Sequence, residues 1–226
     1  MNIWLILILV MVGSYIIQAM LQSRFSKYSQ VRNPSGLTGA EVARMMLEDH
    51  GIRDVKISCI PGQLTDHYNP QTKTVNLSQG VYGSCSVAAA AVAAHECGHA
   101  VQHEVGYAPL KLRSALVPVV SFSSKVVTWV LLLGMLLINI FPQLMLFGII
   151  LFGLTTLFSV VTLPVEINAS HRALEWLNNS GITDYTNHEY ASSALKSAAY
   201  TYVVAALSSL ATLMYYVMIF MGGRRN

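Results

Sequence analysis

The segment VAAHECGHAVQH at residues 92–103 contains His95, Glu96 and His99 in the spacing H-E-x-x-H. On an α-helix, side chains four residues apart lie on the same face, so both imidazoles can reach one metal ion. Glu96 lies one position further along, where its carboxylate can contact a water on that ion without binding the ion itself. This arrangement is typical of zinc hydrolases. We therefore expect His95 and His99 to bind zinc and Glu96 to be the catalytic base; a structural pair of histidines is the alternative.

The residues around this motif favour a helix. Six alanines lie between positions 88 and 94, and alanine is the strongest helix former. We predict a helix from about Val87 to Val105, ended by Gly106 and Pro109. Cys97 lies about 200° around this helix from His95, so we expect it to pack in the interior and not to bind zinc.

The composition is that of a membrane protein. Of 226 residues, 54% are hydrophobic and only 11% are charged, whereas soluble domains carry about 25% charged residues. The net charge of +3 is spread along the chain, without the basic block that nucleic-acid binding requires. The lipid bilayer is therefore an expected partner, and nucleic acid is not.

Apolar segments long enough to cross a bilayer alternate with more polar segments. Arg24, Lys27 and Arg32 follow the first apolar run and place the next segment in the cytoplasm by the positive-inside rule. A short uncharged turn, Asn139–Gln143, makes a hairpin of the second and third runs. Arg224 and Arg225, after the last run, conflict with the rule. The single domain, 1–226, is predicted to contain spans at 3–21, 116–163 (the hairpin) and 198–221, and cytoplasmic parts at 22–115 and 164–197.

The cytoplasmic parts carry their own secondary-structure signals. Thr38 and Glu41 predict a capping box at the start of a helix over 39–50. Alternating residues predict two short strands near 55–59 and 74–77. We expect TVNLS at 74–78 to be an edge strand that binds substrate backbone, or else part of a plain hairpin. Pro164 predicts the start of a helix that Gly181 ends, and short helical and apolar stretches follow over 188–197 and 198–221. The predicted fold is mainly α: a polytopic membrane protein with about four transmembrane helices and a small α+β, zincin-like cytoplasmic portion.

A zinc hydrolase site needs a third protein ligand, and Glu166 is the strongest candidate. It follows the hairpin that returns the chain to the same side, and its own helix face carries the small residues Ala169, Ser170 and Ala173. The alternative is that Glu166 only stabilises a helix N-terminus. A rival ligand is His103, although it would lie about 6 Å beyond His99 on a straight helix. The remaining histidines considered are less favoured: His67, His171 and His188.

With these motifs in view, the chain resembles the neutral zinc metallopeptidases of bacterial membranes, the YugP-like family. The resemblance implies one Zn²⁺ bound by His95, His99 and Glu166, and Glu96 as catalytic base, as in gluzincin-type metalloendopeptidases. It extends over nearly the whole chain and rests on GLTGAEVAR at 36–44, LTDHYNP at 64–70, the segment 74–103, and PVEINASHRAL at 164–174.

Two positions depart from related patterns. The layout is also similar to that of prenyl-protein and HtpX-type membrane proteases, which carry E-x-x-x-D with the Asp supporting a ligand histidine; this chain has Ser170 there. YugP-like sequences usually have Asp where this chain has Asn168. An amide oxygen can still accept a hydrogen bond from an imidazole, and such supporting groups contribute about 10–100-fold to metal affinity.

The sequence therefore predicts a membrane-embedded protease that hydrolyses peptide bonds near the cytoplasmic face of the bacterial cell membrane, acting on a membrane-proximal protein or peptide. The oxyanion donor is expected among Tyr68, His67, His171 and Arg172. Two alternatives remain: a zinc-binding membrane scaffold or assembly factor without proteolysis, and a zinc hydrolase that acts on another bond. Glu96 favours hydrolysis, because a structural zinc site has no use for a carboxylate beside its ligands.

Overall fold

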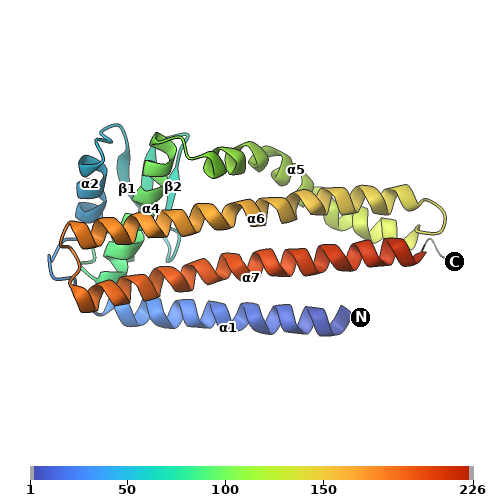
Figure 1. The fold of residues 1–226 in the computed structure, drawn as a ribbon, viewed down its shortest axis with the longest axis horizontal. Helices are drawn as coiled ribbons and strands as arrows, with labels where there is room; N and C mark the ends of the chain where they lie inside the picture. The colour runs from blue at the N-terminus through green and yellow to red at the C-terminus, as the bar shows by residue number, and fades with distance from the viewer. Residues whose placement is uncertain (1–2, 224–226) are drawn as a thin grey trace.

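Seven helices and one small sheet make up residues 3–223, the part of the chain that the computed structural model describes (Figure 1). Arg224 and Arg225, which conflict with the positive-inside rule, lie outside the described residues. The elements in chain order are α1 (Ile3–Ser29), α2 (Gly39–Asp49), β1 (Lys56–Ile60), β2 (His67–Asn69), β3 (Thr74–Ser78), α3 (Gln79–Tyr82), α4 (Val87–Glu104), α5 (Ala108–Leu136), α6 (Pro142–Asn179) and α7 (Tyr185–Gly223).

These elements form two regions. We call residues 30–107, together with the parts of α6 and α7 at 164–198, the head. We call α1, α5 and the remaining parts of α6 and α7 the bundle. In Figure 1 the head lies at one end, and the long helices extend from it to the end at which the chain termini lie. The hairpin of α5 and α6 therefore returns the chain to the head, as the sequence predicted.

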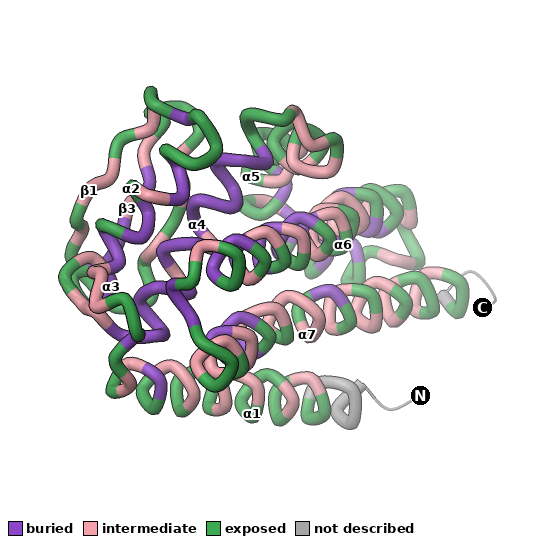
Figure 2. The backbone as a smooth tube through the Cα atoms, turned by 60° about the vertical axis from the view of Figure 1, so that its left-hand side comes forward, coloured by how far each residue is buried: buried purple, intermediate pink, exposed green. Residues whose placement is uncertain are grey.

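The head has a conventional buried core. Thr38 and Glu41 form the predicted capping box at the start of α2, and the buried side chains of α2 pack with those of α4 and the sheet. The buried residues concentrate on α4 and on the elements beside it (Figure 2). The core of the head comprises Val42, Met46, Val75, Leu77, Val81, Val87, Ala173 and Leu177, with the alanines of α4.

The sheet differs from its prediction. Its strand order is β1-β3-β2, with β3 parallel to β1 and antiparallel to β2. The TVNLS segment is therefore the central strand and not an edge strand: both of its backbone edges are already paired, so it cannot bind substrate backbone. The edge strand on one side is β2, a three-residue segment too short to show a periodic pattern.

Two predicted helix boundaries are also wrong. Pro164 lies inside the continuous helix α6 and does not begin a helix, and α7 is likewise one helix through the segments predicted separately over 188–197 and 198–221. Proline is tolerated in a long membrane helix, where neighbouring helices and local adjustments satisfy the freed carbonyl. Because Glu166 lies in mid-helix, the alternative that it stabilises a helix N-terminus does not apply.

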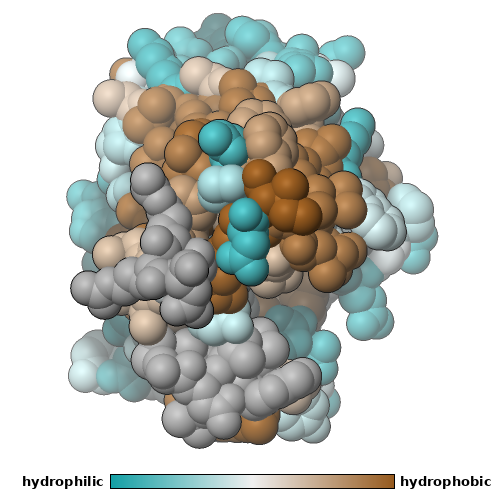
Figure 3. All heavy atoms as spheres, turned by 90° about the vertical axis from the view of Figure 1, so that its right-hand side faces the viewer, coloured by the Kyte–Doolittle hydropathy of each residue, from teal (hydrophilic) through white to brown (hydrophobic). Residues whose placement is uncertain are grey.

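The bundle helices have the length and polarity of membrane spans. Four helices in the described part of the chain are long and apolar enough to cross a membrane. The 38 residues of α6 extend about 57 Å, so this helix exceeds the roughly 30 Å of a bilayer core and continues into the head. The α5–α6 turn lies at 137–141. Viewed from the end opposite the head, the described surface is mostly hydrophobic (Figure 3).

Candidate metal centre

Helix α4 is positioned by its cap and by close contact with α6. Ser86 caps it, its Oγ accepting a hydrogen bond from the backbone N–H of Ala89 at 3.1 Å. A Cβ atom at Gly98 would lie 2.7 Å from the backbone oxygen of Ala169, so only glycine allows this approach of the two helices. The residue just before the second motif histidine is thus glycine because α6 passes directly against it.

Three side chains from these two helices converge. The Oε2 atom of Glu166 lies 3.3 Å from Nε2 of His95 and 3.5 Å from Nε2 of His99. One donor atom from each residue lies within 4.8 Å of the others, a spacing that could hold a metal ion. Glu166 is 3% exposed, so its charge requires a partner in this interior.

The donor set fits zinc. Ligands at about 2.0–2.1 Å in a tetrahedron are separated by about 3.3–3.4 Å, close to the two histidine–carboxylate distances of 3.3 and 3.5 Å. Two imidazoles and one carboxylate are also the ligand types of catalytic zinc sites that leave a fourth position for water. Burial lowers the pKa of His99, but the carboxylates of Glu166 and Glu96 outweigh burial and raise that pKa overall. The site therefore favours positive charge.

Each histidine has a partner on its second ring nitrogen, which leaves Nε2 directed at the shared site. Nδ1 of His95 lies 3.1 Å from Oγ of Ser170. Nδ1 of His99 lies 3.0 Å from Oε1 of Gln102. Ser170 therefore holds an imidazole from the position that an aspartate occupies in the pattern E-x-x-x-D.

The tautomer of His99 is fixed by a chain of hydrogen bonds. Arg172 can only donate, and its Nε donates to Oδ1 of Asn168 at 2.8 Å. That oxygen also accepts a bond from Nε2 of Gln102 at 2.9 Å, and Nε2 donates further to the backbone oxygen of Val165 at 2.8 Å. The amide oxygen of Gln102 must then face His99 and accept its Nδ1 proton, so Nε2 of the imidazole keeps a free lone pair. Asn168 supports the histidine through Gln102 and not directly.

A cavity of about 520 Å³ opens at these side chains. It contains Glu96, which lies beside the three donors but is not one of them. Its other walls come from the segment around β2, the first turns of α5, and α7. The lining comprises Asp66, His67, Tyr68, Pro70, Gln71, His95, Glu96, His99, His103, Leu110, Arg113, Ser114, Val117, Glu166 and Tyr202.

This geometry agrees with the comparisons with known proteins. The family model described as "Putative neutral zinc metallopeptidase" matches residues 3–221. The chain belongs to this neutral zinc metallopeptidase family. A relative named "Putative membrane protease YugP" from Bacillus subtilis (strain 168) is 44% identical over 211 residues, which cover 93% of each chain. No solved structure matches the chain.

The structure of this family member separates the remaining candidates by position. Tyr68, His67 and His103 line the cavity, and Oη of Tyr68 lies 3.2 Å from Nδ1 of His103. His171 is exposed and pairs with Glu175 at 3.7 Å, outside the cavity.

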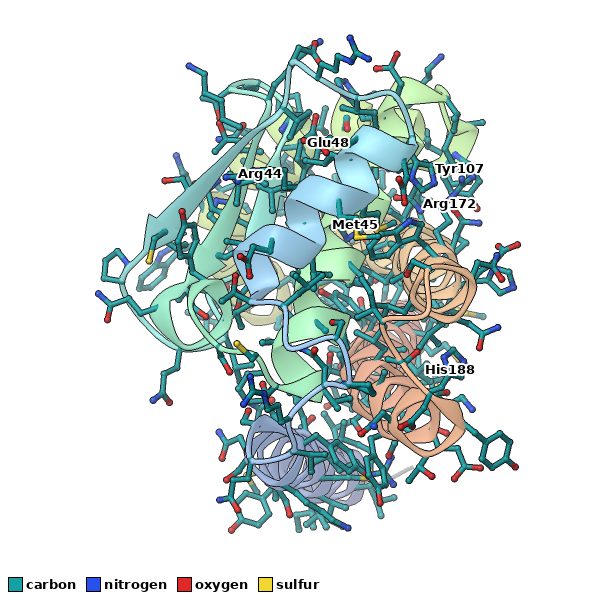
Figure 4. All side chains as sticks on the ribbon, turned by 90° about the vertical axis from the view of Figure 1, so that its left-hand side faces the viewer. Arg44, Met45, Glu48, Tyr107, Arg172 and His188 are labelled. Carbon is teal, nitrogen blue, oxygen red and sulfur yellow. The ribbon has the colours of Figure 1, made fainter. Side chains whose placement is uncertain are left out.

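Arg172 and His188 do not line the cavity; Figure 4 labels both on the side of the head where α6 and α7 lie. Because neither Arg172 nor His171 lines the cavity, neither is placed to act as an oxyanion donor there. Cys97 packs in the head, its thiol 3.5 Å from the backbone oxygen of Ala43, and burial raises its pKa.

Three residues at this site do not emerge from the sequence. In the sequence Gln102 is one polar residue on a predicted helix. Its spacing of three from His99 is the only signal that could have indicated a contact between the two side chains. Arg113 reads as a cationic flank of a membrane segment, yet its Nη1 lies 3.5 Å from Oε1 of Glu166. Tyr202 reads as an interfacial aromatic residue, yet it lines the cavity. Each role depends on where a distant helix passes.

Proposed function

We propose that this protein is a membrane-embedded zinc metallopeptidase that hydrolyses peptide bonds at the cytoplasmic face of the membrane. The observation that carries the proposal is the convergence of two imidazoles and one carboxylate in a cavity that also contains a second carboxylate, Glu96. The first three groups would hold one zinc ion. The fourth is then available for proton transfer.

The residues divide the chemistry among them. Zinc, when bound by His95, His99 and Glu166, supplies a Lewis acid that acidifies a water and polarises a carbonyl. The Glu96 carboxylate takes the proton from the attacking water and passes it to the nitrogen of the departing amine. Arg113 pairs with the other oxygen of Glu166 and places a positive charge beside that carboxylate. Tyr68, held by His103, is the hydroxyl proposed to stabilise the oxyanion.

Peptide is favoured over other substrates by the edge of the sheet. Strand β2 is paired on one side with β3, and residues of β2 line the cavity. An extended peptide can add to the other side of such a strand through backbone hydrogen bonds, with side chains in neighbouring pockets. The proposal thus moves the substrate-binding role predicted for TVNLS to β2. The printed name of the B. subtilis relative, a membrane protease, supports the same class of reaction.

The test is Glu96→Gln. The variant should keep zinc, because Glu96 is outside the donor group, and should lose at least about 100-fold in peptide hydrolysis, the contribution of a general base. Zinc content by atomic absorption and cleavage of unfolded casein are measured on the same preparations.

The matched control is Gln71→Glu, at an exposed residue of the same cavity, which should stay active. If Glu96→Gln loses its zinc, Glu96 is a ligand or stabilises the fold. Wild-type protein that retains zinc but cleaves nothing would support the scaffold alternative.

A further inference from the structure

A second, smaller cavity adjoins the candidate metal centre. Its volume is about 170 Å³. It shares Asp66, His95, Glu96 and Tyr202 with the larger cavity, so the two spaces meet at one candidate metal donor, His95, and at the proposed base, Glu96. A peptide that lies across the candidate metal centre would therefore place a side chain from one side of the scissile bond in each cavity.

The walls of this smaller cavity are largely apolar and come mostly from the first and last helices. Val92 precedes His95 by about one turn of α4 and places the cavity directly beside the motif. On α7, Ala194 and Ala198 are one turn apart, and their short side chains leave the space that larger residues would fill. The apolar lining also includes Leu21, Phe25, Leu64 and Leu195.

We propose that this cavity is a specificity pocket for one apolar side chain, of the size of leucine, on the residue next to the scissile bond. The inference rests on the proposed function. Apolar walls favour such a side chain through the area removed from water, whereas a charged side chain would lose hydration on entering them. The carboxylates of Asp66 and Glu96 at the shared boundary oppose acidic side chains in particular.

The experiment uses binding, so that it does not depend on turnover. Zinc-loaded full-length protein in nanodiscs is titrated calorimetrically with two peptide hydroxamates that differ only in the side chain next to the hydroxamate, leucine or glycine. Wild type should bind the leucine compound at least about 10-fold more tightly, the scale of discrimination in an apolar pocket. Ala198→Leu fills the cavity and should bring the ratio close to one, with the glycine compound unaffected. Ala205→Leu, exposed on the same helix, should keep the wild-type ratio.

A second variant keeps the proposal testable if Ala198→Leu does not fold. Leu21→Ala enlarges the pocket and should shift the preference from the leucine to the phenylalanine hydroxamate. An unchanged ratio of leucine to glycine hydroxamate affinity in Ala198→Leu would overturn the proposed specificity pocket.

An acyl chain that co-purifies with wild type and is lost in Ala198→Leu would also overturn it, because the occupant of the cavity would then be lipid. Binding of neither compound would overturn the pocket together with an accessible zinc ion beside it. Side-chain discrimination without cleavage of any peptide would reject only the proposed peptidase.

Discussion

The head and the bundle are held together in different ways, although α6 and α7 belong to both. In the head, Met46 and Leu77 are fully buried, and polar groups close the helix ends. In the bundle, Phe122, Trp129 and Leu136 are 64, 68 and 73% exposed, a surface that is stable only in an apolar solvent. One helix can therefore serve as a membrane element in one half and carry a metal ligand in the other. The candidate site lies where the environment changes.

The division into a cytoplasmic head and a membrane bundle would be contradicted most completely by a different membrane topology. If the head is cytoplasmic, its exposed Cys59 should react with an impermeant thiol reagent only after cells are permeabilised. Gln143→Cys in a Cys59→Ser background, near the far turn of the bundle, should react in intact cells. Labelling is read by mass spectrometry. The reverse pattern would place the head and its site outside.

Glu166→Ala removes the proposed ligand that α6 brings into the head. Zinc affinity should fall by well over the roughly 10–100-fold that a lost supporting group costs. The thermal stability of the variant should approach that of chelator-treated wild type, because metal binding contributes to folding. Zinc content and melting temperature are measured in detergent.

His103→Ala is the control for Glu166→Ala, since His103 is exposed on α4 and bonded to Tyr68. It should stay near wild type in both measurements. A site emptied by His103→Ala and kept by Glu166→Ala would replace Glu166 with His103 in the ligand set.

Gln102→Leu tests the hydrogen bonds that link α4 to α6 within the head. The leucine leaves Nδ1 of His99 without its acceptor, so zinc affinity should fall about 10–100-fold, measured by competition with a chelator. Gln71→Leu, on the exposed rim of the cavity, should bind zinc normally. Wild-type affinity in Gln102→Leu would show that the chain from Arg172 does not orient the imidazole.

The smallest effect should be confined to the head. Thr38→Ala removes one half of the capping box and should cost about 1 kcal/mol in the opening free energy of α2, measured by hydrogen exchange corrected for intrinsic rates. Bundle peptides should be unaffected, and Thr212→Ala in α7 should leave α2 unchanged. Faster exchange throughout the protein in Thr38→Ala would mean that the head and the bundle unfold as one unit.

The same cap predicts a pH dependence. The backbone N–H and hydroxyl of Thr38 lower the pKa of Glu41 below its ordinary value of 4.5. The ionised carboxylate therefore stabilises the fold above pH 4.5, and this contribution is lost as pH falls through the lowered pKa. The difference in α2 opening between wild type and Thr38→Ala, measured by the same hydrogen exchange, should accordingly narrow in acid.

Local chemistry predicted part of this structure. The capping box and the bounds of α4 follow from short-range preferences, and the convergence of His95, His99 and Glu166 follows from helix periodicity and a returning hairpin. Pairing between distant segments was not accessible. TVNLS is central because β1 and β2 both pair with it, and Pro164 is ambiguous because proline is common both at helix starts and inside membrane helices. The role of Gln102 depends on where α6 passes, which its own neighbours do not encode.

The donors and walls of the site are spread along the chain in an order that matters during synthesis. α4 emerges with both histidines well before α6 brings Glu166, and Tyr202 of α7 closes the cavity last. A nascent or truncated chain that ends before α6 has the motif but not the proposed third ligand. Under the proposed function, competence for hydrolysis is acquired only after the hairpin has entered the membrane and returned, so the growing protein is not exposed to its own activity while it is still unfolded.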